Sequence, residues 1–75
     1  MVLKTLSSLL IGEKARVTEV RTQGGMRRRF LDIGLIKGTV IECVGVGAAG
    51  DPKAFLIRGA VIAIRNDDSS FVLVE

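Results

Sequence analysis

The sequence predicts a mostly β fold, a small and strongly bent barrel of about five strands with one short helix inserted after the first strand. Short apolar runs alternate with turn residues along most of the chain, and one stretch between them has a helical period instead. Size agrees, because 75 residues with 48% hydrophobic content can form only one domain, which we assign to residues 1–75. A core this small benefits from a sheet that closes its own edges.

The first part of the chain predicts a helical turn and then a strand. Residues 5–10 favour a short helical turn before a bend. Residues 13–21 alternate in hydrophobicity, with Ala15 and Val17 on one face, as a half-buried strand does.

The inserted helix is predicted over Met26–Ile33. Gly34 follows it, and a residue without a Cβ suits the left-handed position after a helix end. At 100° per residue Met26, Phe30 and Ile33 share one face of this helix. We therefore expect that face to lie in the core.

The second half of the chain predicts the other strands, at residues 39–46, 54–58, 60–65 and 71–74. Gly59 separates two of them and indicates a tight hairpin. Residues 66–70 form a turn with room for one helical turn, which Asn66 or Asp67 would cap. Phe71, like Phe30, is expected on a core face.

The residue inventory argues against an enzyme and against a metal site. There is no His to act as a general base near neutral pH, and a lone Cys43 cannot complete a zinc or iron site. Cys43 sits in an apolar strand, where a buried small hydrophobe is the default reading. Asp51, Asp67 and Asp68 fall in turns, where backbone geometry explains them. We expect no cofactor, no metal site, and ferrous iron binding no tighter than the roughly millimolar range of weak oxygen sites.

The same inventory predicts a cytoplasmic protein. One cysteine cannot form an internal disulfide, and a secreted domain of this size would usually need several. No signal peptide is evident. The longest uncharged stretches, Thr5–Gly12 and Cys43–Gly50, are eight residues each, far below the roughly 20 that span a bilayer. Direct membrane insertion is not expected.

Basic residues gather in the first half, where residues 1–38 carry eight basic and three acidic side chains. Arg27, Arg28 and Arg29 lie in or near the first turn of the predicted helix, although cations are unfavourable at that end of the helix dipole. One interpretation is a partner-binding site formed by these three arginines. The other is a solvated face, in which Arg28 and Arg29 pair with Asp32.

Several motifs in order resemble the FeoA family, ferrous iron transport protein A and its related domains. They are Arg28-Arg29-Phe30-Leu31-Asp32-Ile33-Gly34-Leu35, Gly38, Gly50-Asp51-Pro52, Val61–Arg65 and Asp67-Asp68. The family often has Pro before the glycines at 12 and 38, where this chain has Ile11 and Lys37. The resemblance implies an SH3-like barrel in the cytoplasm without catalysis of its own. It also implies a role with FeoB, a membrane ferrous iron transporter that carries a GTP-binding domain.

The leading hypothesis is therefore a small regulatory protein of ferrous iron uptake that binds the cytoplasmic GTPase domain of a FeoB-type transporter. One alternative is a nucleic-acid-binding barrel, motivated by the basic half. It lacks a stacking platform, because the chain has no Tyr or Trp and only three Phe, so no nucleic-acid partner is expected. A second alternative is a domain that binds ferrous iron or GTP directly, which the ligand inventory opposes. Oligomerisation stays open.

Overall fold

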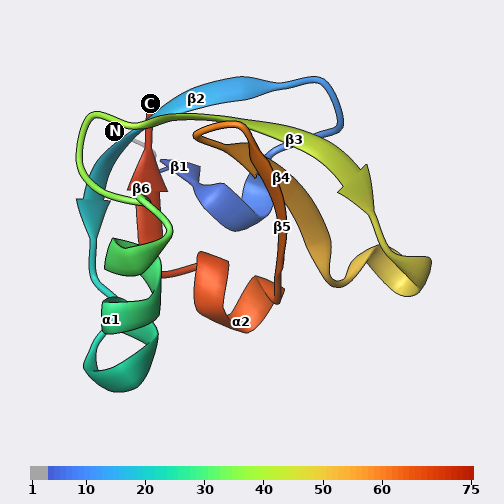
Figure 1. Cartoon of the computed structure of the whole chain (residues 1–75). Coiled ribbons are helices and arrows are strands. Elements are labelled where there is room, and N and C mark those ends of the chain that lie inside the picture. The colour runs from blue at the N-terminus through green and yellow to red at the C-terminus, as the bar shows by residue number, and fades with distance from the viewer. Residues whose placement is uncertain (1–3) are drawn as a thin grey trace.

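One antiparallel sheet of six short strands bends into an incomplete SH3-like barrel (Figure 1). The computed structural model describes residues 4–75, so residues 1–3 of the predicted domain lie outside the described residues. The strands are β1 (Lys4–Thr5), β2 (Lys14–Val20), β3 (Val40–Val46), β4 (Lys53–Ile57), β5 (Ala60–Ile64) and β6 (Val72–Val74). They lie in the order β1-β6-β2-β3-β4-β5. The predicted fold class is confirmed.

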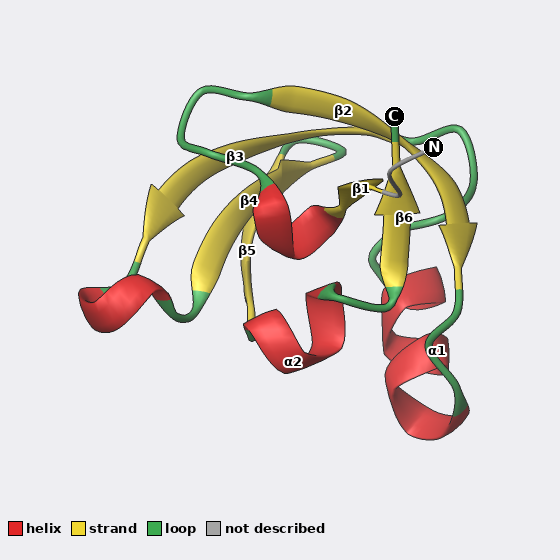
Figure 2. Cartoon of the chain, turned by 180° about the vertical axis from the view of Figure 1, so that it is seen from behind, coloured by secondary structure: helices red, strands yellow, loops and turns green. Residues whose placement is uncertain are grey.

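Two α-helices and two 3₁₀ turns complete the chain. They are α1 (Gly24–Asp32), α2 (Asn66–Ser69), η1 (Leu6–Ser8) and η2 (Ala48–Gly50). Figure 2 shows from behind that α1 and α2 both lie at the lower end of the barrel. No helix within residues 4–75 has the length and apolar character to cross a membrane.

The core is aliphatic, with two phenylalanines at its centre. Its buried members are Leu6, Leu9, Ala15, Val17, Phe30, Leu35, Ile41, Cys43, Phe55, Ile57, Ile64, Val72 and Val74. The predicted inward face of β2 is confirmed. The predicted apolar face of α1 is confirmed as well, because Phe30 is only 2% exposed while Met26 and Ile33 pack against the core with part of their surface open.

Helix α1 ends at Asp32, one residue earlier than predicted, and Gly34 takes the predicted left-handed position after the helix end. Gly34 has a φ of +85°. Its N–H donates to the Leu31 carbonyl at 3.1 Å, and the Leu35 N–H donates to the Phe30 carbonyl at 2.8 Å. This pair of hydrogen bonds satisfies carbonyls at the helix end that would otherwise lack partners. At its other end α1 begins at Gly24, two residues earlier than predicted.

The hairpin between β4 and β5 turns over two residues. Arg58 and Gly59 have φ values of +49° and +85°, and Ile57 pairs with Ala60 on either side of them. Positive φ at both central residues is the turn geometry that matches the twist of a two-residue hairpin. The hairpin predicted at Gly59 is confirmed.

The prediction for Phe71 is wrong. Its side chain is 54% exposed, and the third phenylalanine, Phe55, is fully buried instead. Strand β6 starts one residue later, at Val72, and lies between β1 and β2 with all three of its residues buried. Phe71 stands before the strand, at the end of α2, where it is turned outward.

Charged side chains also hold the amino-terminal segment in place. The Glu13 carboxylate accepts hydrogen bonds from Lys4 Nζ and from the Leu10 N–H. The Lys4 bond first, and the Leu10 bond next, hold the pKa of Glu13 below its ordinary value of 4.5. Lys53 Nζ donates to the carbonyls of Ser7 at 2.6 Å and Leu9 at 2.9 Å, which fastens η1 to β4.

Replacing Phe30 tests whether α1 closes the core. Phe30→Ala should lower the free energy of unfolding by about 3–5 kcal/mol, because the change removes a buried ring and leaves a cavity. Phe71→Ala is the matched control, since the exposed ring should contribute only about 0.5 kcal/mol. Thermal or urea unfolding measures both. Equal effects of the two substitutions would contradict the packing described here.

Candidate functional site

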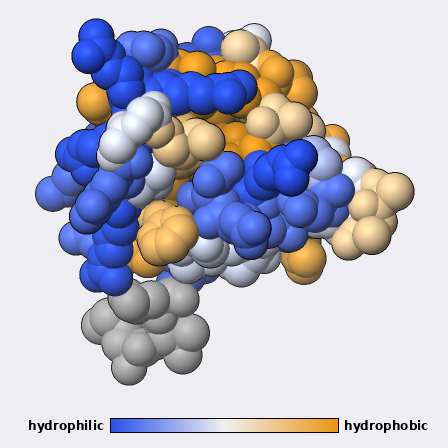
Figure 3. All heavy atoms as spheres, turned by 90° about the horizontal axis from the view of Figure 1, so that it is seen from below, coloured by the Kyte–Doolittle hydropathy of each residue, from blue (hydrophilic) through white to orange (hydrophobic). Residues whose placement is uncertain are grey.

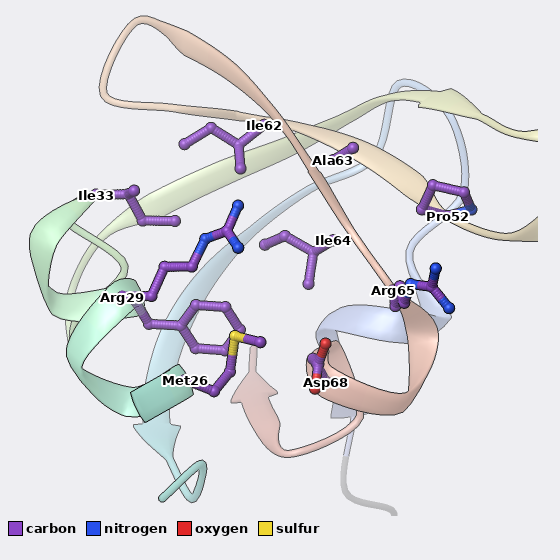
Figure 4. A pocket seen from close by; sticks show the side chains of 10 residues that line it. Met26, Arg29, Ile33, Pro52, Ile62, Ala63, Ile64, Arg65 and Asp68 are labelled. Carbon is purple, nitrogen blue, oxygen red and sulfur yellow. The ribbon is translucent and has the colours of Figure 1, made fainter. Parts of the chain in front are cut away.

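A groove of about 350 Å³ lies between α1 and β5 (Figure 4). Its apolar lining comes mainly from Met26 and Phe30 of α1, from Ile33 directly after α1, and from Ile62 and Ile64 of β5. The apolar stripe that begins on α1 therefore contributes both to the core and to the groove. Phe30 fills the interior, while Met26 and Ile33 leave part of their surface available in the groove.

Arg29 is the charged residue in the middle of the groove. Its side chain extends from α1 toward Ile62 and Ile64 (Figure 4). Arg65 and Asp68 also line the groove, but within residues 4–75 the only ion pairs are Lys4–Glu13 and Arg21–Glu19, so Arg29 forms no ion pair. A guanidinium beside apolar side chains is well placed to bind a carboxylate from another molecule.

Both ends of the groove are held by polar contacts. At the hairpin end, Arg58 Nε donates to the Gly34 carbonyl at 3.3 Å, joining the β4–β5 turn to the end of α1. A Cβ on Gly34 would come within 2.3 Å of the Arg58 side chain, so glycine also makes room for this contact. Thr39 Oγ1 donates to the same Gly34 carbonyl at 2.8 Å.

At the other end, the Gly50-Asp51-Pro52 motif is joined to α2. The Asn66 N–H donates to Asp51 Oδ1 at 2.9 Å, and Asn66 Nδ2 donates to the Gly50 carbonyl at 3.1 Å. The predicted capping of α2 by Asn66 or Asp67 is therefore wrong. The preceding residue, Arg65, is the N-cap and makes no side-chain cap, so a carboxylate from a distant loop takes that role.

A second hollow continues the groove around the start of α1. It has a volume of about 470 Å³ and shares Met26 and Asp68 with the first. It ends at the exposed Phe71 ring and the buried hydroxyl of Thr22, which has no hydrogen-bond partner in the described part of the chain. Seen from below, hydrophobic side chains reach the surface with hydrophilic residues on both sides of them (Figure 3).

The structure separates the three arginines predicted to bind a partner. Arg27 Nη1 donates to the Val20 carbonyl at 3.1 Å and lines a different hollow, beside β2. Arg28 is exposed and lines neither hollow. Arg29 alone lies in the groove, because consecutive helical residues point about 100° apart. The sequence-based prediction that all three bind a partner stays untested, and of the three only Arg29 lies where this groove could use it.

The alternative of local pairing on α1 is wrong for this conformation. In the described chain neither Arg28 nor Arg29 forms an ion pair with Asp32. The side chains of Arg28, Arg29 and Asp32 are all exposed. An ion pair between exposed residues on a helix surface contributes only about 0.3–0.5 kcal/mol.

The groups considered for chemistry do not come together. Cys43 is fully buried, as expected, with Sγ 3.6 Å from the Gly45 carbonyl oxygen. Across residues 4–75 no three His, Cys, Asp or Glu side chains gather into a group that could hold a metal ion. What the geometry offers is a largely apolar groove with Arg29 at its middle and Arg65 and Asp68 also in its lining, which suits the binding of a protein segment.

The contact between Asp51 and Asn66 can be tested by its effect on stability. Asp51→Ala should lower the free energy of unfolding by about 0.5–2 kcal/mol, the usual loss when a helix start loses its side-chain acceptor. Asp67→Ala removes an equal charge from an exposed position and should cost less. Urea unfolding of both variants compares them, and an Asp67→Ala loss as large as that of Asp51→Ala would refute the capping role.

Comparison with known proteins gives one family. The pattern that defines the FeoA domain matches residues 4–75. The Fe(2+) transport protein A/Fe(2+) transporter FeoB fusion protein of Porphyromonas gingivalis is 30% identical over 70 residues, which are 93% of this chain and 8% of that protein. The chain thus spans less than a tenth of the length of that relative.

Solved structures agree with this comparison. The FeoA protein of Chlorobium tepidum superposes with a TM-score of 0.89 at 29% identity, over 96% of this chain and 69% of that one. The zinc-complexed FeoA of Stenotrophomonas maltophilia, described as a prokaryotic SH3 domain protein, gives a TM-score of 0.85 at 26% identity, over 96% of this chain and 89% of that one. The SH3-like barrel is therefore shared across the whole described chain.

Proposed function

The chain belongs to the FeoA family, and from this premise we propose that it assists ferrous iron transport by binding the cytoplasmic GTPase domain of a FeoB-type transporter. The groove between α1 and β5 is the proposed contact. The observation that carries the proposal is Arg29, a guanidinium without an ion pair that lies among apolar side chains, beside the partly open surfaces of Met26 and Ile33.

The fusion protein of Porphyromonas gingivalis supports the choice of partner. It carries transport protein A and the transporter FeoB in one chain. Joining two binding modules raises the effective concentration of one for the other, which is useful when the two work in contact. The Stenotrophomonas protein has also been put forward as an activating factor for ferrous iron transport.

The groove favours a protein partner over a nucleic acid. Nucleic acids are bound by stripes of cations that follow phosphates, together with aromatic rings on which bases stack. Here Arg27, Arg28 and Arg29 point in different directions around α1. The groove itself is lined mainly by aliphatic side chains, which suit the anchors of a protein segment. We infer a binding module that works without catalysis of its own.

Charge reversal at Arg29 tests the proposed contact. Arg29→Glu should weaken binding to the purified cytoplasmic GTPase domain about tenfold or more, a loss of about 1.4 kcal/mol or more, because it places a like charge against an acidic partner group. Arg28→Glu is the matched control, with the same charge change one residue away and outside the groove. We expect it to change affinity about twofold at most, the small effect of an exposed surface charge.

Calorimetric titration at two salt concentrations measures both variants, and their melting curves check folding. Equal losses for the two variants would indicate a general charge effect and exclude the groove. Absence of binding by the unaltered protein would exclude this partner. A gel shift of DNA or RNA with steep salt dependence would instead support the nucleic-acid alternative.

A further inference from the structure

Strand β5 is the last strand of the sheet, and no other strand of residues 4–75 pairs with its outer edge. On its inner edge it pairs with β4, from Ile57–Ala60 to Lys53–Ile64, without a bulge. In a two-residue hairpin the residues flanking the turn form the closing hydrogen-bonded pair, and such pairs then alternate. Ala60, Ile62 and Ile64 therefore bond to β4.

Val61 and Ala63 then direct their N–H and C=O groups away from the sheet. No hydrogen bond to another segment of residues 4–75 involves either residue's backbone. Val61 is 65% exposed, so solvent reaches this part of the edge. Four backbone groups are thus available in the repeat of an antiparallel ladder.

The β5 edge lacks the protection that exposed edges usually carry. Natural sheets block their edges with short strands, proline, bulges or charged side chains within the strand. At the opposite edge of this sheet, β1 has two residues within the described part of the chain. β5 has five residues, all of them alanine, valine or isoleucine, and no irregularity in its pairing.

The groove lies alongside this edge. β5 forms one wall through Ile62, Ala63 and Ile64, and α1 forms the other wall. Alternate side chains of a strand in this position would face the apolar surfaces of Met26 and Ile33, as alternation along a strand requires. The guanidinium of Arg29 lies between the walls and forms no ion pair within residues 4–75 (Figure 4).

From the open edge, the groove beside it and the guanidinium of Arg29, we propose that the partner binds as an extended segment that adds a strand to β5. The segment alternates apolar and other side chains and places a carboxylate against Arg29. Backbone hydrogen bonds to Val61 and Ala63 supply affinity, and Arg29 with the apolar wall supplies specificity. The proposal rests on the proposed function for the identity of the partner protein, but not for the chemistry of the segment.

A second copy of this chain fits the edge less well. Two β5 strands paired about a two-fold axis would each bring their own Arg29 and Arg65 to the shared interface, since such an interface repeats the same patch on both sides. The strand itself has no acidic residue, and Asp68 is the one carboxylate in the groove lining, so each copy would bring two cations and one carboxylate to the interface. An acidic segment of another protein could pair with the open edge of β5 and place a carboxylate beside Arg29.

The direct test is amide hydrogen exchange of the full chain, measured with and without a peptide. The probe is a blocked peptide of about seven residues, long enough for one strand, with alternating valine and glutamate. A valine–lysine peptide of the same length is its control. We expect exchange at Val61 and Ala63 to slow on the order of tenfold with the glutamate peptide only, as new hydrogen bonds form.

Two substitutions locate the contact. Ala63→Pro removes an edge N–H that β4 does not use, so the fold should persist while peptide binding is lost. Ala63→Val keeps the N–H and should bind as the unaltered protein does. Arg29→Glu should abolish the preference for glutamate over lysine in the peptide.

The outcomes separate this inference from the proposed function. Peptide binding without protection of Val61 and Ala63, unchanged binding by Ala63→Pro, or no binding at about millimolar peptide, the limit of weak affinity, would each overturn strand addition. Protection by the peptide together with no binding of the transporter's GTPase domain would retain strand addition and overturn the proposed partner. Protection of the same two amides by the transporter domain would support both.

Discussion

Phe30 packs where the sheet of this barrel stops. The backbone ladder ends at β5, so hydrogen bonds cannot close the barrel on that side. The buried ring of Phe30, carried by α1, packs there against the core and replaces backbone pairing with hydrophobic contact. A small barrel that is closed by a side chain keeps its core side chains buried while one strand edge stays open.

The position of α1 follows from contacts at both of its ends. Arg27 reaches the Val20 carbonyl at the start of the helix, and Gly34 meets Arg58 and Thr39 at its end. These contacts set the spacing between α1 and β5, and hence the width of the groove. The residue that fills the core and the residue that projects into the groove, Phe30 and Arg29, are neighbours in sequence. Stability and binding therefore depend on the same placement of one helix.

Much of the fold could be predicted from local patterns, because those patterns have local causes. Alternation in β2, the stripe on α1 and the turn at Gly59 each reflect geometry within a few residues. β1 was missed because two residues cannot show a period. Phe71 was misplaced because an apolar residue next to a strand reads as part of it, whereas β6 begins one residue later.

The candidate site was harder to predict, since it depends on contacts between distant segments. The cap of α2 by Asp51 joins residues 15 positions apart, and no pattern within α2 signals it. The three adjacent arginines look like one group in the sequence. In a helix their side chains point in different directions, because consecutive residues are about 100° apart. The signal that could have singled out Arg29 was its position next to Ile33 on the helical wheel, at the edge of the apolar stripe. The open edge of β5 has no sequence signature, because it depends on the order of strands in the sheet.

Amide hydrogen exchange of the protein alone tests the central claim, that α1 closes the core while β5 keeps a free edge. We predict alternation along β5. The amides of Ile62 and Ile64 should exchange slowly because they bond to β4, and those of Val61 and Ala63 should exchange nearly as fast as in an unstructured peptide. Uniformly slow exchange along β5 would show that the edge is already paired or covered, and would contradict this account of the structure.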